Sequence, residues 1–485
     1  MAAPAPSEEK LSASQLGWYG LGAVPHGVGI TVGTFLVFYY NQVLGVPGAS
    51  VGLAILVGSI FDAVTDPIVG AISDRTHSRW GRRHPYLFCS SIPLGIGFYF
   101  LWVPPSGLGE SGLVAWLVAM LVINKLLSTI YFVPYLAFGA ELSGDYLERT
   151  RVTTARSVVM NIGRSATGAA LLLYFLRPTE LFPNGQLNPE GYPPFAISFG
   201  IVIAMSLMLM AYKTRFDGRR LGGAGSEVGD LSAGSVFMAP LRDMRDALRY
   251  RPFRALTFAV VLSYTAFGVS DALGLYMITF FWGFPTHFLF VWGVGMSTGM
   301  YLGFWLWQTV GKHVEKRTVY LIASIGYLLF FPGPYVLAAI GWWPAPESAL
   351  YVPLYIGTTG VIAHVFAAGP SIMTGSMLGD ITDLDELETG KRREGVLFGA
   401  ESLAYKMVSG VGPFIAGLLI DLANITPEMQ PGEAPEHTIK MLGLGQGATS
   451  AALFVAAIFL IARYDLTRER HDRTLRALAE RRRSA

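Results

Sequence analysis

Two aspartates inside a strongly apolar segment are the residues of this sequence best placed to do chemistry. Asp62 and Asp66 stand in the run FDAVTDP. A spacing of four places both side chains on one face of a helix, where two carboxylates repel each other unless a cation or a proton lies between them. The pair therefore predicts a site for a coupling ion, either Na⁺ or H⁺. Salt bridges to Lys or Arg elsewhere in a helix bundle are the alternative interpretation.

Further oxygens lie close to this pair in the sequence. Thr65 adds a hydroxyl, and Pro67 has no N–H to offer the carbonyl of Ala63 one turn earlier. A Na⁺ ion at Asp62 and Asp66 would need several such oxygens, whereas a proton needs only one carboxylate. The residues leave the choice between Na⁺ and H⁺ open, and no other cofactor is expected.

The composition indicates the environment of these carboxylates. Of the 485 residues, 52% are hydrophobic and only 14% are charged, whereas soluble chains are about 25% charged. This favours a polytopic membrane protein over a disordered chain, a coiled coil or a typical soluble enzyme. The single cysteine excludes an intramolecular disulfide framework. A net charge of only +2 gives no global field for nucleic acid, so no nucleic-acid partner is expected.

Twelve apolar stretches are long enough to cross a bilayer as helices, which takes roughly 20 residues. They lie near residues 15–42, 49–73, 85–103, 111–139, 153–176, 193–213, 252–282, 286–311, 317–341, 350–379, 394–422 and 441–465. We therefore expect an all-α integral membrane protein with twelve transmembrane helices.

Basic residues concentrate in alternate connections, which indicates orientation because basic loops stay in the cytoplasm. Lys and Arg gather near residues 74–84, 213–254, 312–317, 391–393 and 481–483. The opposite loops hold little beyond Arg177 and Lys440. We expect a multi-pass protein of a bacterial-type inner (plasma) membrane, with both termini in the cytoplasm and attraction of the basic segments to anionic membrane lipid.

The chain divides into two similar halves. The expected parts are an N-terminal cytoplasmic segment (1–14), a six-helix bundle (15–213), a central cytoplasmic loop (214–251), a second six-helix bundle (252–465) and a basic cytoplasmic tail (466–485). GAISDRTHSRWGRR follows the second span and is weakly echoed by GKHVEKR after the eighth. Two six-span repeats are typical of the major facilitator fold, whose substrate site lies near the midplane between the halves.

The run from Gly70 to Arg83 resembles the signature of that superfamily after its second helix. An aspartate at a helix end can pair with an arginine of another helix and hold the inner gate, and the pair can break when the halves move. The residues expected at this gate are Asp74, Arg75, Arg79 and Arg82. Charge that merely sets the topology is the alternative.

Ionisable residues inside membrane helices are functional candidates because burying them is costly. Those expected near a substrate are Lys125, Arg156, Glu401 and Lys406, joined by His26 of the first span. Internal salt bridges, or for His26 simple packing, are the alternatives. No Walker A run is present, and no HExxH or GxSxG lies in a loop long enough for a catalytic domain. A transporter without its own ATPase is therefore expected, not an enzyme.

Several long motifs together resemble the glycoside–pentoside–hexuronide:cation symporters of the major facilitator superfamily. They are FDAVTDPIVGAISDRTHSRWGRRHPY, TIYFVPYLAFGAELSGDYLERTRVTTAR and TGKRREGVLFGAESLAYK, in this order. The resemblance implies Na⁺- or H⁺-coupled symport by alternating access. It places the cation site on Asp62, Asp66, Thr65 and Thr129, with Thr65 standing where melibiose permease has asparagine. It also assigns the arginine of span five to Arg156 and the lysine of span eleven to Lys406.

The sugar-binding pattern of melibiose permease does not carry over to this sequence. Its aspartate of span one falls on His26 or Gly27, its aspartate of span four on Phe132, and the following tryptophan on Leu136. Because carboxylates bind sugar hydroxyls through strong charge-assisted bonds, their loss makes the cavity more apolar. We expect a monomeric symporter of a small molecule: a glycoside, a sugar acid or an amphipathic anion such as a lysophospholipid. A proton-driven exporter is the rival.

Overall fold

The computed structural model describes residues 10–142, 146–221, 241–427 and 429–484, and all regular structure in these ranges is helical. Twelve helical segments of this described part are long and apolar enough to cross a membrane. Each coincides with one of the twelve predicted spans, so the all-α membrane fold is confirmed. Residues 1–9 and 222–240, which include most of the expected N-terminal segment and half of the expected central loop, lie outside the described residues.

The first compact unit comprises Met1–Val46 and Val57–Phe237. It contains α1 (Ala13–Leu21), α2 (Val24–Phe38), most of α3 (Gly48–Arg75), α4 (His84–Trp102), α5 (Glu110–Glu141), α6 (Tyr146–Ala170) and α7 (Tyr192–Leu221). α4 packs against α5 and α7, while α2 packs against α6. The first span is formed by α1, α2 and a π-helical turn at Tyr39–Val43.

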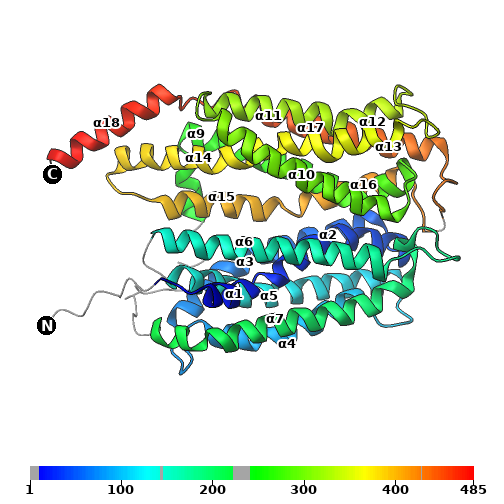
Figure 1. The fold of residues 1–485 in the computed structure, drawn as a ribbon, viewed down its shortest axis with the longest axis horizontal. Helices are drawn as coiled ribbons and strands as arrows, with labels where there is room; N and C mark the ends of the chain where they lie inside the picture. The colour runs from blue at the N-terminus through cyan, green and yellow to red at the C-terminus, as the bar shows by residue number, and fades with distance from the viewer. Residues whose placement is uncertain (1–9, 143–145, 222–240, 428, 485) are drawn as a thin grey trace. The chain divides into compact units, whose positions relative to one another are not determined.

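The second unit comprises Pro47–Leu56 and Met238–Ala485. It contains α9 (Arg251–Tyr276), α10 (Thr286–Val310), α11 (Lys316–Phe330), α12 (Pro332–Ala339), α13 (Tyr351–Tyr355), α14 (Ala363–Thr389), α15 (Glu394–Val408), α16 (Val411–Leu422), α17 (Glu436–Ile461) and α18 (Arg468–Ser484). Within this unit α14 packs against α10, α11 and α18, and α9 packs against α16 and α17. Figure 1 shows α11 and α17 running side by side.

The tenth span is longer than its apolar stretch predicts. We expected it to end near residue 379, but α14 continues to Thr389 and ends at Gly390, whose φ of 74° is left-handed. The extra turns carry three aspartates, and each is bound by a cation from another segment. Lys316 binds Asp380, Arg392 binds Asp383 and Arg393 binds Asp385. These ion pairs allow the helix to continue where hydrophobicity alone would end it.

Small residues bring α4 and α7 unusually close. A Cβ added to Gly95 would lie 2.4 Å from the carbonyl oxygen of Gly200, and one added to Gly200 would lie 2.7 Å from the carbonyl oxygen of Gly95. Close backbone approach through small residues is a main source of helix association in membranes, where hydrophobicity offers little difference between lipid and protein.

We expect Gly95→Ala to destabilise the first unit by about 1–3 kcal/mol, because the added methyl group forces α4 away from α7. The measurement is the Tm of the purified protein in detergent. Gly29→Ala is the matched control, since a Cβ on this α2 glycine meets no atom within 4 Å. Equal melting points for the two variants would contradict the close-packing interpretation.

Candidate functional site

The two aspartates of the predicted ion site lie on α3 and share one hydroxyl of α5. The Oγ1 atom of Thr129 lies 3.1 Å from Oδ1 of Asp62 and 2.9 Å from Oδ1 of Asp66. Thr129 is almost fully buried, and both aspartates are half-buried. α3 remains helical through Pro67, which keeps the two carboxylates on one face. The structure thus brings together three of the four residues predicted for the cation site around a single oxygen.

Thr65, the fourth predicted residue, is buried on α3 between the two aspartates. Its hydroxyl donates to the carbonyl oxygen of Phe61 at 3.0 Å, a local bond within the helix. The hydroxyl oxygen keeps lone pairs that can still face a cation. Thr65 therefore contributes an oxygen to the neighbourhood, while the direct link between the carboxylates is made by Thr129.

Lys125 supplies a positive charge at the edge of this group. It lies one turn before Thr129 on α5, and its Nζ atom is 3.6 Å from Oδ2 of Asp62. We expected Lys125 among the substrate ligands or internal ion pairs, and the structure places it against the ion site. Its positive charge lies beside Asp62, and the hydroxyl of Thr129 links Asp62 to Asp66.

Two predicted substrate residues contact each other beside the ion site. The rings of His26 on α2 and Phe132 on α5 stack with centroids 4.6 Å apart and planes inclined by 7°. Phe132 lies three residues after Thr129, so the stack stands about one helical turn from the shared hydroxyl. The face of α5 therefore carries Thr129 of the predicted ion site at one level and an aromatic ring at the next.

Arg156 lies on α6 close to the hydroxyl of Tyr19 on α1, with which it interacts electrostatically. The ring of Tyr19 stacks on Tyr135 of α5 at 4.7 Å, and the Tyr135 hydroxyl donates to the Tyr19 carbonyl oxygen at 3.1 Å. Our sequence analysis named Arg156 but missed Tyr19. A tyrosine in an apolar span gives no signal of its own, because most such residues are packing or interfacial residues.

The second unit holds the remaining predicted substrate residues on α15. Glu401 and Lys406 are both half-buried. Glu401 interacts electrostatically with Tyr264 of α9 and with Tyr405. The rings of these two tyrosines meet edge to face at 4.6 Å. A carboxylate beside two aromatic rings is a set of groups that can bind hydroxyls or a cationic group of a substrate.

Two of the four predicted gate residues, Asp74 and Arg82, belong to an ionic cluster around Arg83, an arginine that our prediction omitted. Arg83 precedes α4, is 5% exposed, and forms an ion pair with Asp74 at the end of α3. Its Nη2 and Nε atoms lie 2.8 and 3.0 Å from Oε1 of Glu141 at the end of α5. Arg82 reaches the same oxygen at 3.0 Å. The cluster thus joins the ends of three helices of the first unit.

The other two predicted gate residues are Arg75 and Arg79, and both have exposed side chains. Arg79 is placed over the ring of Trp80, 4.9 Å from its centroid. Arg83 ends the same basic run and Glu141 follows the fourth span in GAELSGDY, but neither position indicates in the sequence that the two side chains meet.

The second unit has an equivalent ion pair between two helix ends. Nζ of Lys316, at the start of α11, lies 2.7 Å from both carboxylate oxygens of Asp380 near the end of α14. In each half, a cation at the start of the third span therefore binds a carboxylate at the end of the fourth. This equivalence strengthens the internal repeat that the sequence only suggested.

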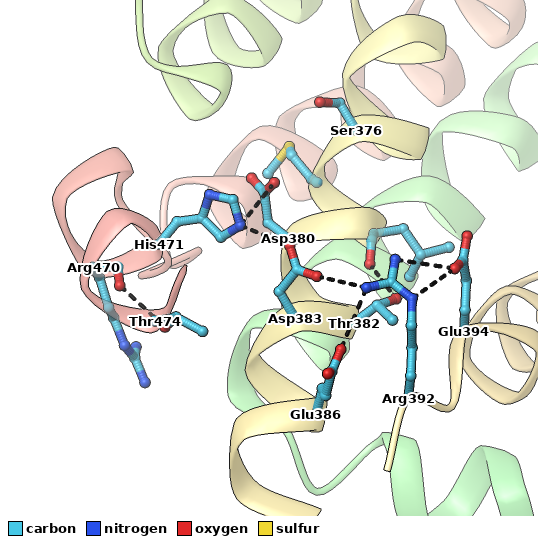
Figure 2. Close-up of polar contacts among 12 residues, drawn as sticks. Ser376, Asp380, Thr382, Asp383, Glu386, Arg392, Glu394, Arg470, His471 and Thr474 are labelled. Carbon is cyan, nitrogen blue, oxygen red and sulfur yellow. Dashed lines mark hydrogen bonds and ion pairs between the residues drawn. The ribbon is translucent and has the colours of Figure 1, made fainter. Parts of the chain in front are cut away.

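A second ionic group follows in the segment between α14 and α15. Arg392 reaches Asp383, Glu386 and Glu394 at 3.1–3.3 Å, as Figure 2 shows. Arg393 binds the fully buried Asp385, with Nε 3.0 Å from Oδ2, and this hydrogen bond raises the pKa of Arg393 above its ordinary value. The TGKRREG motif thus fixes the turn that positions α15 and its Glu401 and Lys406.

Comparison with known proteins identifies the family. The model of the MFS/sugar transport protein family matches residues 18–468. The chain belongs to this family. An uncharacterized symporter of Synechocystis sp. is 24% identical over 96% of each chain. The isoprimeverose transporter of Lactiplantibacillus pentosus is 22% identical over 87% of this chain and 84% of its own. The resemblance to glycoside–pentoside–hexuronide:cation symporters is confirmed, and the family is one of transporters, not enzymes.

Two further comparisons concern the range of related transporters and the fold. The sodium-dependent lysophosphatidylcholine symporter 1-A of Danio rerio is 23% identical over 94% of this chain and 86% of its own. Among solved structures, the nucleoside transporter NupG aligns with a TM-score of 0.60 at 13% identity, covering 92% of this chain and 99% of NupG. The fold is therefore that of major facilitator transporters.

We expect Glu141→Gln to lower the Tm of the purified protein, with a loss of about 1–3 kcal/mol in the free energy of unfolding. The change removes one carboxylate from a buried arginine, which keeps its ion pair with Asp74. Arg79→Gln is the control, because Arg79 is exposed over Trp80. If Arg79→Gln lowers the Tm as much as Glu141→Gln, the cluster around Arg83 has no special role in stability.

Proposed function

We propose that this protein is a symporter that uses a Na⁺ or H⁺ gradient to move a sugar, a glycoside or a similar polar organic solute by alternating access. The ion binds at Asp62 and Asp66 with oxygens of Thr129 and Thr65. The substrate contacts the wall of His26 and Phe132 and the charged groups Arg156, Lys406 and Glu401. No resident cofactor is required.

The observation that carries the proposal is the shared hydroxyl of Thr129. A hydroxyl has one proton to donate, yet Oγ1 lies within 3.1 Å of both carboxylates. If both aspartates are ionised, the single hydroxyl proton can point at only one of them. The hydroxyl oxygen then faces the other carboxylate oxygen with no proton between them. A proton on one carboxyl, or a cation against the oxygens, makes both contacts favourable. The geometry is therefore suited to a site that holds an added positive charge.

Ion binding and substrate binding would be coupled because the ion site lies close to the aromatic wall of His26 and Phe132. Thr129 and Phe132 lie on one helix and one turn apart, so ion binding that reorients α5 or the Thr129 hydroxyl also acts on the His26–Phe132 stack. Ion and substrate affinities would then be linked, and linkage is reciprocal. A symporter requires this linkage, since a carrier that holds only the ion or only the substrate must change state less readily than the empty or the fully loaded carrier.

The alternative substrate is an amphipathic anion, and one observation favours it. The position of a sugar-binding carboxylate is occupied by Phe132, which stacks on His26, and Arg156 lies near the Tyr19–Tyr135 pair. Aromatic surface beside a cation suits an acyl chain with an acidic headgroup. The relative whose name specifies lysophosphatidylcholine supports this alternative.

We also propose the orientation and state of the protein. The helix ends that carry the Arg83 and Arg392 clusters face the cytoplasm, because basic residues concentrate there. Both termini then lie inside a bacterial inner (plasma) membrane. The protein acts as a monomer in contact with membrane lipid, and the central loop of residues 214–251 joins the two bundles on the cytoplasmic side.

Replacing both carboxylates tests the ion site directly. We expect Asp62→Asn with Asp66→Asn to abolish concentrative uptake into vesicles, because an uncharged pair no longer gains from binding an ion. The measurement is uptake of a glycoside panel and of lysophospholipids, each driven by a Na⁺ or a pH gradient. The control is Glu110→Gln with Glu347→Gln, which removes the same charge at exposed positions. Intact concentrative uptake by the aspartate variant would refute the proposal.

Replacing Lys125 tests whether its positive charge competes with the bound ion. We expect Lys125→Gln to tighten ion binding about three- to tenfold, because a half-exposed cation 3.6 Å from Asp62 no longer competes with the ion. The half-saturating Na⁺ concentration of uptake should fall; for a proton-coupled carrier, the pH of half-maximal uptake should rise. Lys391→Gln, at an exposed loop position, is the control. Weaker ion binding in Lys125→Gln would show that Lys125 supports the ion instead of competing with it.

A further inference from the structure

A pocket of about 390 Å³ lies in the second unit, at the end of the helices that the proposed topology places in the cytoplasm. Its walls come from the connection between α10 and α11 (311–317), from Asp380 of α14, and from residues 466–472 at the start of α18. None of these residues belongs to the proposed ion or substrate site. The volume is near the lower end of those that hold small ligands.

Cations without carboxylate partners line this pocket. Lys312 and Arg468 are exposed, and no described carboxylate forms a salt bridge with either of them. Arg317 is half-buried and its Nη2 atom donates to the carbonyl oxygen of Ala462, which again leaves its charge without a carboxylate among the described residues. Three positive charges from two separate segments therefore converge on one hollow.

The aspartate in the wall is already neutralised. Both oxygens of Asp380 are bound by Lys316, and Nε2 of His471 lies 3.5 Å from Oδ1. Figure 2 shows the His471 ring of α18 directed at Asp380 and at Asp383, which it reaches at 3.1 Å. The remaining acidic groups, Glu315 and Asp472, are exposed side chains of the lining. The pocket thus keeps an excess of positive charge.

Two helix N-termini add to this charge. α11 begins at Lys316 and α18 begins at Arg468, and both first residues line the pocket. The N-cap of α11, Glu315, makes no side-chain bond to the first turn, so N–H groups of that turn stay available. At α18 the hydroxyl of Thr467 already accepts a hydrogen bond from the N–H of Arg470. The positive ends of the helix dipoles and the remaining N–H groups of the first turns favour phosphate and other anions.

We propose that this pocket binds a phosphate monoester group and thereby holds α18 against the connection between α10 and α11. A phosphate monoester carries nearly two negative charges and several acceptor oxygens, which match three unpaired cations and two helix N-termini. The group could belong to a free small phosphate or to the headgroup of phosphatidic acid at the inner membrane surface. Binding acts through α18 and is separate from solute transport.

The test uses the purified full-length protein and amide hydrogen exchange of residues 311–317 and 466–474. One arm adds glycerol 3-phosphate in detergent against chloride at equal ionic strength. The other compares nanodiscs that contain phosphatidic acid with nanodiscs of phosphatidylcholine alone. Saturable protection of both segments supports the pocket, and the arm in which it occurs identifies a free or a lipid phosphate. Absence of protection in both arms overturns the proposal.

Variants separate specific binding from general charge. Lys312→Gln with Arg468→Gln should weaken binding about tenfold, as expected for the loss of two modest charge-assisted contacts. Lys391→Gln with Arg476→Gln removes the same charge outside the pocket and should leave the affinity unchanged. Asp472→Asn should tighten binding, because it removes a negative charge from the lining. Equal weakening by the two double variants, or weaker binding by Asp472→Asn, overturns the proposal.

Discussion

The repulsion between two carboxylates on one helix face is the constraint on which the first unit of this protein depends. Inside a membrane helix, Asp62 and Asp66 are costly unless hydrogen bonds and positive charge compensate them. α3 stays helical through Pro67 and keeps them aligned, while α5 places Thr129 between them and Lys125 beside them. In the proposed mechanism, a bound cation or a proton on one carboxyl adds to this compensation.

Ion pairs join helix ends in both halves of the chain, but different residue types form them. In the first unit a buried Arg83 holds Asp74 and Glu141 together. In the second, Lys316 holds Asp380, and His471 and Arg392 extend the ionic group to α18 and α15. An arginine can bind two carboxylates at once through its fork of donors, whereas a lysine acts as a compact charge. The second half therefore uses further cations, and one of them, His471, links its ion pairs to the C-terminal helix α18.

Much of this organisation could be predicted from the sequence, and the parts that could not share a physical cause. Apolar length predicted all twelve spans, and the spacing of Asp62 and Asp66 predicted a shared face. Three features could not be predicted: the central role of Arg83 in the ionic cluster of the first unit, the length of α14, and the stack of His26 on Phe132. Each depends on which residues of different helices meet, and neither periodicity nor composition contains that register. Glu141 and Tyr19 illustrate this point, since both are unremarkable in the sequence and acquire their roles only through a neighbouring helix.

Under the proposed function, the positions of Thr129 and Phe132 on α5 would let one family keep its ion site while its substrates differ. The ion site needs few groups at fixed spacing, because a cation is small and its ligands must converge on one point. The substrate wall needs only a surface of suitable shape and polarity, so Phe132 can replace a carboxylate without moving Thr129. One helical turn separates the two requirements. In the proposed mechanism, a change at the wall therefore alters what is carried, while the hydroxyl of Thr129 keeps its place at the ion site.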